Sequence, residues 1–205
     1  METKKPFLKL TVGAQYIAIN TPNAQGEYDP SKFSPTIKQE TVKTLGTTEN
    51  SESSNVRSSG ILYETISQTS SVELALDVVA FDVETLAKLR GDVIDESGLI
   101  SSGRASKRPY FAFGYVERKL GGVRYVWYPK CQLVENSDDI KTSEEKFSEQ
   151  NSSIKIRAYS FNEMNDVKNY IDSEISSFPK GITEDKFFEK PILTKEQLKQ
   201  VSVGG

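Results

Sequence analysis

Hydrophobic and polar residues alternate along several stretches of the chain, and such alternation predicts half-buried β-strands. In the clearest stretch, Ser71 to Val79, Glu73 and Asp77 point away from a face that carries four apolar residues (Val72, Leu74, Leu76 and Val78). Lys9 to Asn20 predicts a first strand, and Ser153 to Phe161 predicts a closing strand. We therefore expect a mostly β fold, in which the polar face of the clearest strand meets water or a polar cavity.

A run of aromatic residues from Tyr110 to Lys130 predicts a β-hairpin. Its two strands flank Gly121 and Gly122, and a glycine pair provides the positive φ angles that a tight turn needs. Pro129 cannot donate a hydrogen bond to a neighbouring strand, so it indicates a strand end or a bulge. Because aromatic residues favour packed strands, we expect five of them to lie in the core or at a subunit interface: Phe111, Phe113, Tyr125, Trp127 and Tyr128.

Three segments have the spacing of helices. Asp82 is a good N-cap and Gly91 a good C-terminal cap for a short helix between them. Asn162 to Ser177 spaces its apolar residues like an amphipathic helix, and Lys195 to Val201 allows a further short one. The prediction is one short α-helix that flanks the β-structure and a partly helical C-terminal extension over residues 162–205.

Residues 46–60 differ from the rest of the β-domain that we expect over residues 1–161, because they contain almost no side chain that could be buried. Such a segment cannot by itself offset the entropy of becoming ordered. It is either a mobile surface loop or an arm that becomes ordered only against a neighbouring subunit. The polar residues that would make the contacts of such an arm are Thr47, Glu49, Asn50, Glu52, Asn55 and Arg57.

The composition argues against several functions. The chain of 205 residues has a net charge of −3, contains no histidine, and has Cys131 as its only cysteine. Without histidine, Ser-His-Asp and Cys-His catalysis and the common zinc sites are excluded. A carboxylate mechanism stays open, although no acidic pair lies in a recognisable catalytic motif. We expect no catalytic, cofactor or metal site and, because no apolar run approaches the roughly 20 residues of a membrane span, no membrane segment.

The aromatic hairpin allows a second function. From Arg104 to Lys130, seven basic residues accompany a single acidic residue, Glu117. Aromatic side chains interleaved with basic ones are typical of sheets that bind single-stranded nucleic acid by stacking. The alternative is therefore a stand-alone β-barrel that binds a single strand through residues 110–130, although the acidic balance of the whole chain favours buried aromatics.

Three passages of the chain resemble the major tail protein, or tail tube protein, of long-tailed bacteriophages that infect Gram-positive bacteria. They are residues 71–100, 108–135 and 141–161. In that family an alternating strand leads into a short helix that ends near a glycine, and an aromatic strand of the Y-A-F-G-Y type follows. A hairpin then returns as R-Y-V-W-Y-K, and a K-T-x-E-E turn precedes a closing strand that has an arginine such as Arg157 near its end. This chain shows these features in that order.

The resemblance implies a fold and a role. The fold would be a β-sandwich or barrel-like subunit, and six subunits would form a ring whose sheets join into an inner barrel. Rings would stack into the tube of a virion tail, assembled in the host bacterial cytoplasm with a tape-measure protein and tail-end proteins. Double-stranded DNA would pass through its lumen at infection.

The polar face of the Ser71 to Val79 strand suits a wall between a wet lumen and a core. The chain has no lysine or arginine from Gln68 to Ala87. We therefore expect Glu73 and Asp77 to face the lumen, unless this face is the outer surface of the tube.

Overall fold

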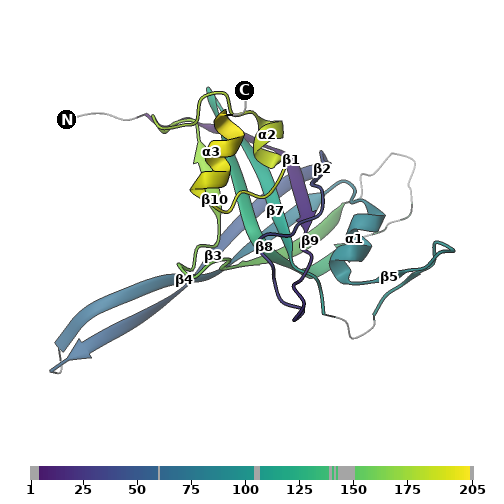
Figure 1. The fold of residues 1–205 in the computed structure, drawn as a ribbon, viewed down its shortest axis with the longest axis horizontal. Coiled ribbons are helices and arrows are strands. Elements are labelled where there is room, and N and C mark those ends of the chain that lie inside the picture. Colours follow the sequence, from purple (N-terminus) through teal and green to yellow (C-terminus); the bar gives the residue numbers. More distant parts are fainter. Residues whose placement is uncertain are drawn as a thin grey trace.

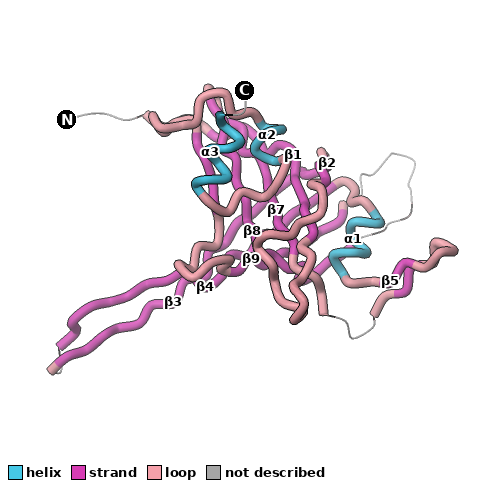
Figure 2. Tube along the Cα trace, in the orientation of Figure 1, coloured by secondary structure: helices cyan, strands magenta, loops and turns pink. Residues whose placement is uncertain are grey.

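The computed structural model describes residues 5–59, 61–103, 107–138, 140, 142 and 151–203 (Figures 1 and 2). Its strands are β1 (Lys9–Ile19), β2 (Ile37–Gln39), β3 (Val42–Ser58), β4 (Ile61–Val78), β5 (Val93–Ile94), β6 (Ile100–Ser101), β7 (Phe111–Lys119), β8 (Gly122–Asp138), β9 (Ser152–Tyr159) and β10 (Asn169–Asp172). Its helices are α1 (Val83–Arg90), α2 (Glu184–Phe188) and α3 (Lys195–Val203). The fold is mostly β with a few short helices, as the alternation predicts.

The strand β8 is the centre of a large antiparallel sheet. Within the described residues the strand order is β2-β1-β7-β8-β9-β4-β3. β7 occupies one side of β8, whereas β10 and β9 share the other side: β10 pairs with Arg124 to Trp127, and β9 pairs with Cys131 to Asp138. The ladder between β7 and β8 changes register close to Pro129, which confirms the bulge that this proline predicts.

The sheet curls around a first hydrophobic core. The four apolar residues predicted on one face of β4 are all at most 2% exposed: Val72, Leu74, Leu76 and Val78. They belong to the same cluster as Ile17 of β1, Phe113 of β7 and Ile156 of β9. Because strands from both halves of the strand order meet in this cluster, the sheet closes on itself and gives a β-sandwich-like fold.

The C-terminal extension covers the opposite face of β1, β7 and β8. Alternate residues of these strands, among them Tyr16 and Trp127, point to that face and cluster with Phe187 and Phe188 of α2. Gly114 of β7 lies directly beneath these rings, since a Cβ at this position would come within 2.8 Å of the Phe188 ring. The extension therefore provides a second core, and its strand β10 also joins the main sheet.

The helix α1 begins and ends where its caps predict. The Asp82 side chain accepts a hydrogen bond from the Thr85 amide at 2.8 Å, and Gly91 takes a left-handed conformation with φ of 75°. Both groups satisfy backbone atoms that a helix end leaves unpaired.

The polar segment 46–60 lies largely within a long strand, which its composition did not predict. β3 pairs with β4 from Val42 opposite Val78 to Ser58 opposite Ile61. A two-stranded ribbon satisfies its backbone hydrogen bonds across the ladder and needs no buried face for that, so counting apolar residues missed it. Beyond Asn50 the ribbon has no third strand beside it among the described residues, and it projects from the body (Figures 1 and 2). We call residues 51–59 and 61–70 the arm.

The helix predicted over 162–177 is wrong, and β10 lies there instead. The Asn162 side chain accepts the Asp166 amide, and Asn165 has a positive φ of 62°, so a turn replaces the first helical turn. Met164, on the expected apolar face, is 85% exposed. Residues 169–172 pair with the part of β8 that β9 leaves open, and this pairing overrides the helical spacing. Lys195 to Val201 does form a helix, as part of α3.

Candidate assembly surfaces

The outer face of β8, β9, β4 and β3 carries a regular array of mostly polar side chains, which we call the wall face. Its residues form three rows across the strands: Gln132, Arg157, Glu73 and Thr48; Glu135, Lys155, Ala75 and Gly46; and Ser137, Ser153, Asp77 and Thr44. These residues alternate with the apolar residues of the first core. The sheet therefore separates that core from a polar surface that faces water in the single chain.

Every described charge on the wall face has a partner. The Arg157 guanidinium donates to Glu73 at 2.6 Å, and the Lys155 ammonium donates to Glu135 at 2.6 Å. Asp77 accepts from the hydroxyls of Ser153 at 2.7 Å and Thr44 at 2.9 Å, and these hydrogen bonds lower the pKa of its carboxyl group. Three carboxylates therefore face two cations, and the wall face is nearly neutral.

The cations on this face correct the picture of Glu73 and Asp77 as unaccompanied carboxylates. Lys155 and Arg157 come from β9, far away in sequence from β4. Both alternate with buried residues along β9, but nothing in the sequence gives the register between the two strands. Because the side chains of Arg157 and Glu73 are 41% and 49% exposed, solvent screens their attraction and the pairing contributes little to stability. The main effect of this pairing is to neutralise charge locally, which reduces the negative electrostatic potential of the surface.

The wall face ends in two strand edges with free segments. β3 is the last strand of the order, and no described strand pairs with its outer side; its first residues face β1 across a groove of about 380 Å³. On the other side, β7 pairs with β8 only up to Cys131, so Gln132 to Asp138 has no strand partner on that side among the described residues. Arg108 covers part of this second edge by donating to the carbonyls of Leu133 and Val134 at 2.7 Å.

The structure places the arm residues that the sequence singled out along β3. Thr47 and Glu49 are exposed, and Glu49 accepts a hydrogen bond from Lys168. Asn50 is half-buried and donates to the Ser71 hydroxyl at 3.4 Å. For Glu52, Asn55 and Arg57 only the backbone pairing with β4 is described. The first three thus belong to the sheet of the body, and the last three belong to the arm.

The aromatic hairpin is internal. Phe111, Phe113, Trp127 and Tyr128 are at most 1% exposed, and Tyr125 is 7% exposed. The alternation divides them: the first two and Tyr128 point into the first core, whereas Trp127 and Tyr125 point to the C-terminal extension. The Trp127 indole donates to the Phe187 carbonyl at 3.1 Å. None of these rings presents a face on which a base could stack.

A buried ionic cluster joins the hairpin to the extension. The Lys119 ammonium donates to Asp172 at 2.6 Å and to Glu174 at 2.7 Å, and the Arg124 guanidinium also donates to Asp172 at 2.6 Å. The side chains of Lys119 and Asp172 are both 4% exposed. Burial opposes both charges, but the hydrogen bonds outweigh it, so the pKa of Lys119 is raised and that of Asp172 is lowered. We call this cluster the ionic lock; nothing in the sequence indicated it, since its members come from three separate segments.

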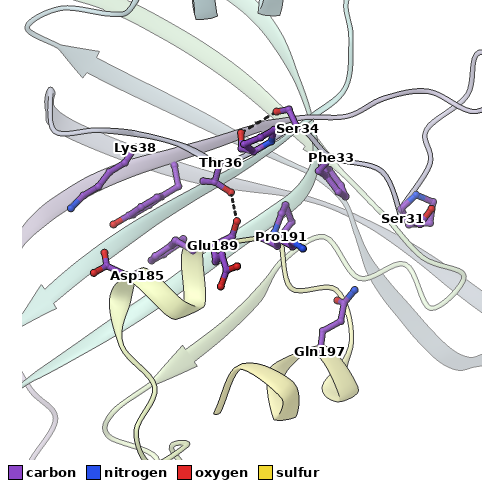
Figure 3. A pocket seen from close by; sticks show the side chains of 14 residues that line it. Ser31, Phe33, Ser34, Thr36, Lys38, Asp185, Glu189, Pro191 and Gln197 are labelled. Carbon is purple, nitrogen blue, oxygen red and sulfur yellow. Dashed lines mark hydrogen bonds between the residues drawn. The ribbon is translucent and has the colours of Figure 1, made fainter. Parts of the chain in front are cut away.

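A groove of about 660 Å³ lies between the loop before β2 and the C-terminal extension (Figure 3). Its labelled residues include Lys38 and Phe33 on one side and Asp185 and Pro191 on the other (Figure 3). At one wall the Tyr16 hydroxyl donates to Glu184 at 2.6 Å; burial first, and then this carboxylate, raise the pKa of Tyr16. A tyrosine held protonated in this way is a structural donor, and the groove offers no activated nucleophile among its described lining residues.

Two further observations concern the described residues alone. They contain no group of three or more acidic, histidine or cysteine residues arranged to hold a metal ion. No helix among them is both long and apolar enough to cross a membrane.

Comparisons with known proteins find similarity at the level of structure. A scan against protein-family models finds no match, and a search of curated proteins finds none either. Among solved structures, the chain is similar to a chain in the cryo-EM structure of the anti-feeding prophage baseplate, with a TM-score of 0.38 and 12% sequence identity. The match covers 83% of this chain and 97% of the other. A similarity of this size carries no argument about function, so the proposals below rest on the residues and surfaces of this chain.

Proposed function

We propose that this chain is the subunit of a phage-type tail tube, in which copies join side by side into rings and rings stack around a channel for double-stranded DNA. The observation that carries the proposal is the wall face, a polar and nearly neutral sheet surface that ends in two free strand edges. Six copies per ring, a tape-measure protein and tail-end proteins as partners, and a virion location after assembly in the host cytoplasm follow from the family resemblance of the sequence. The proposal gives the chain no catalytic step.

The direction of the strands supports side-by-side joining. The four strands of the wall face are antiparallel throughout, so its two edges run in opposite directions. If neighbouring copies in a ring are related by a rotation about an axis parallel to these strands, each strand runs in the same direction in every copy. The rows of the wall face would then bring Thr44 to Thr48 of β3 in one copy opposite Gln132 to Ser137 of the next copy, in antiparallel orientation. Antiparallel ladders are the more stable kind, and joining removes the exposed edges that would otherwise attract wrong partners.

The charge of the wall face supports a channel for DNA. A basic wall would bind phosphates through counterion release and retain the DNA. Three carboxylates balanced by two cations would leave phosphate without a binding site, so DNA could slide past. We therefore expect Glu73 and Asp77 to face the lumen together with Arg157 and Lys155.

Replacing Glu73 and Asp77 together by lysine tests the channel. Both side chains face water in the single chain, so the variant should fold and form rings, but DNA ejection from assembled particles should slow. Glu163→Lys is the control for the change of charge, because Glu163 is exposed and lies outside the wall face. Ejection at the normal rate from intact particles with the double lysine variant would contradict the lumen assignment.

The arm supplies a second test, and the structure decides where the deletion that tests it should begin and end. Removing residues 47–59 would take away part of β3 that pairs with β4 in the body. Deleting Ser51 to Ser70 and closing the gap with Asn-Gly keeps the pairing of Asn50 with Ser71. We expect a folded subunit that does not polymerise, since the arm would contact the next ring. Normal tubes from this variant, seen by electron microscopy, would refute that role of the arm.

The alternative function, binding of single-stranded nucleic acid through residues 110–130, loses its basis when the aromatic rings are buried. Stacking needs exposed ring faces, and the five rings have none. Electron microscopy of the concentrated protein distinguishes the two functions. Rings or tubes are the expected result, whereas a monomer that binds an oligonucleotide in a salt-dependent way would favour the alternative.

A further inference from the structure

The small hairpin of β5 and β6 exposes apolar side chains that nothing in its own chain covers within the described residues. Val93, Ile94, Leu99 and Ile100 are all exposed, and Leu99 is 63% exposed. The hairpin is well built, because the Asp95 side chain accepts hydrogen bonds from the amides of Ser97 and Leu99 and so holds the turn. A two-stranded hairpin of this length gains little stability in water, so burial of its apolar residues against another surface would be favourable. We call residues 92–102 the lobe.

The lobe is acidic. Between Asp92 and Ser102 it contains Asp92, Asp95 and Glu96 but no lysine or arginine. Hydrogen bonds from Ser97 and from backbone amides lower the pKa of Asp95, so its carboxylate stays charged at neutral pH. An apolar surface with an acidic rim fits an apolar surface with a basic rim.

The beginning of the chain offers such a surface. Leu8 is 66% exposed, Leu10 is 60% exposed and Leu120 is 59% exposed, and the Leu120 amide donates to the Leu8 carbonyl at 2.8 Å. Phe7 extends this patch, since its ring contacts the turn between β7 and β8. Two exposed lysines, Lys5 and Lys9, lie in the same segment, and the six residues from Lys5 to Leu10 contain no acidic residue. Two carboxylates from other segments border it, because Glu117 lies 3.7 Å from the Lys9 ammonium and Glu174 accepts from the Phe7 amide at 3.3 Å. Both also pair with the basic residues Arg124 and Lys119, respectively, so the rim remains basic. We call this surface the N-terminal edge.

The two surfaces lie apart in one molecule. β7 begins near the segment that follows the lobe and ends at the N-terminal edge, and a strand of its length spans about 30 Å. Figure 1 shows β5 low on the right, whereas the described chain begins at the upper left. One molecule therefore does not cover its own lobe with its own N-terminal edge.

We propose that the lobe of one copy docks on the N-terminal edge of another copy. The contact joins two different surfaces, so it is heterologous and leaves a free lobe and a free edge at the two ends of every open oligomer. Such contacts propagate into closed rings or into filaments. The inference rests on the proposed self-assembly and adds where two copies touch, at surfaces other than the strand edges of the wall face.

Disulfide cross-linking tests the contact. The only natural cysteine, Cys131, is fully buried, and burial raises the pKa of its thiol, so it gives little background. The double variant Leu8→Cys with Leu99→Cys should form a ladder of covalent oligomers under mild oxidation of the assembled protein, because each copy carries both halves of the contact. Met164→Cys with Leu99→Cys is the matched control, since Met164 is exposed but lies in neither surface.

Charge reversal gives an independent readout of the same contact. Glu96→Lys alone, and Lys5→Glu with Lys9→Glu, should each weaken self-association roughly tenfold or more, as expected when like charges replace opposite ones. Combining the three substitutions should restore association. A loss that the combination does not restore would contradict the pairing of these surfaces.

The outcomes separate this inference from the proposed function. Tubes in the microscope without a cysteine ladder would overturn the lobe contact and leave the tube intact. A covalent dimer from Leu99→Cys alone would show that two lobes meet, which also overturns it. A protein that stays monomeric at every concentration in sedimentation experiments would overturn both proposals.

Discussion

Two lysine–carboxylate pairs of this protein have the same length and opposite surroundings, and they allow a sharp stability prediction. Lys119 and Asp172 lie 2.6 Å apart in the ionic lock, with both side chains 4% exposed. Lys88 and Glu84 of α1 also lie 2.6 Å apart, but their side chains are 49% and 67% exposed. The perturbation is Lys119→Met, and Lys88→Met is its matched control.

The expected magnitudes differ by nearly an order of magnitude. Removing one partner of a buried pair costs about 3–5 kcal/mol because it leaves an uncompensated buried charge. Arg124 still donates to Asp172 in the Lys119→Met variant, so we expect the lower end, about 3 kcal/mol. An exposed pair of residues i and i+4 in a helix contributes about 0.3–0.5 kcal/mol, and methionine and lysine have similar helix propensities.

The assay is equilibrium denaturation of both variants in urea, with thermal unfolding as a second measurement. For a chain of this size, about 3 kcal/mol corresponds to a fall in Tm of roughly 6–12 °C. Lys119→Met should show this fall and Lys88→Met almost none. If the free energies of unfolding of the two variants differ by less than about 1 kcal/mol, the ionic lock does not hold the extension to the hairpin as described.

Three further predictions concern the packing of the C-terminal extension against the main sheet. Trp127→Ala should cost about 3–5 kcal/mol of unfolding free energy, whereas Trp127→Phe keeps an aromatic ring and leaves the Phe187 carbonyl without its donor, which costs about 1–3 kcal/mol; equal costs in denaturation would contradict the burial of the indole. Gly114→Ala should cost about 1–3 kcal/mol, because the new Cβ would overlap the Phe188 ring; a neutral substitution would show that α2 does not lie on β7. The stability advantage of the wild type over Asp172→Asn should be full above pH 3.8, the ordinary pKa of the group, and should fade as the pH falls through its lowered folded pKa; a difference that does not change with pH in denaturation curves would contradict that lowered value.

Much of the fold could be predicted because the signals were local. The alternation of β4 and β9, the turn between β7 and β8, and the caps of α1 each depend on residues that are close in sequence, and the structure confirms these elements. In the turn only Gly121 takes the expected positive φ, of 93°, whereas Gly122 already belongs to β8. The burial of the five hairpin aromatics also agrees with a local preference of aromatic residues for packed strands.

The errors arose where distant partners decide. Val167, Tyr170 and Ile171 have helical spacing, but Tyr170 and Ile171 pair with β8 as part of β10 instead. This pairing is possible because β9 leaves that edge of β8 open, and only the sheet order reveals the open edge. The polar ribbon of β3 has no hydrophobic pattern from which a strand could be predicted. It forms a strand because hydrogen bonds to its partner β4 satisfy its backbone. For the wall face the sequence indicated Glu73 and Asp77 but not the cations beside them, because the register of β4 against β9 is not encoded in either strand alone.

The central claim is that copies of this chain form a tube whose channel is lined by the wall face. A cryo-EM reconstruction of the protein after assembly at high concentration tests it most directly. The account predicts stacked rings in which Glu73, Asp77 and Arg157 face the channel and β3 of each copy pairs with β8 of its neighbour. Rings that carry these three residues on the outside, or a protein that forms no ring at all, would contradict it.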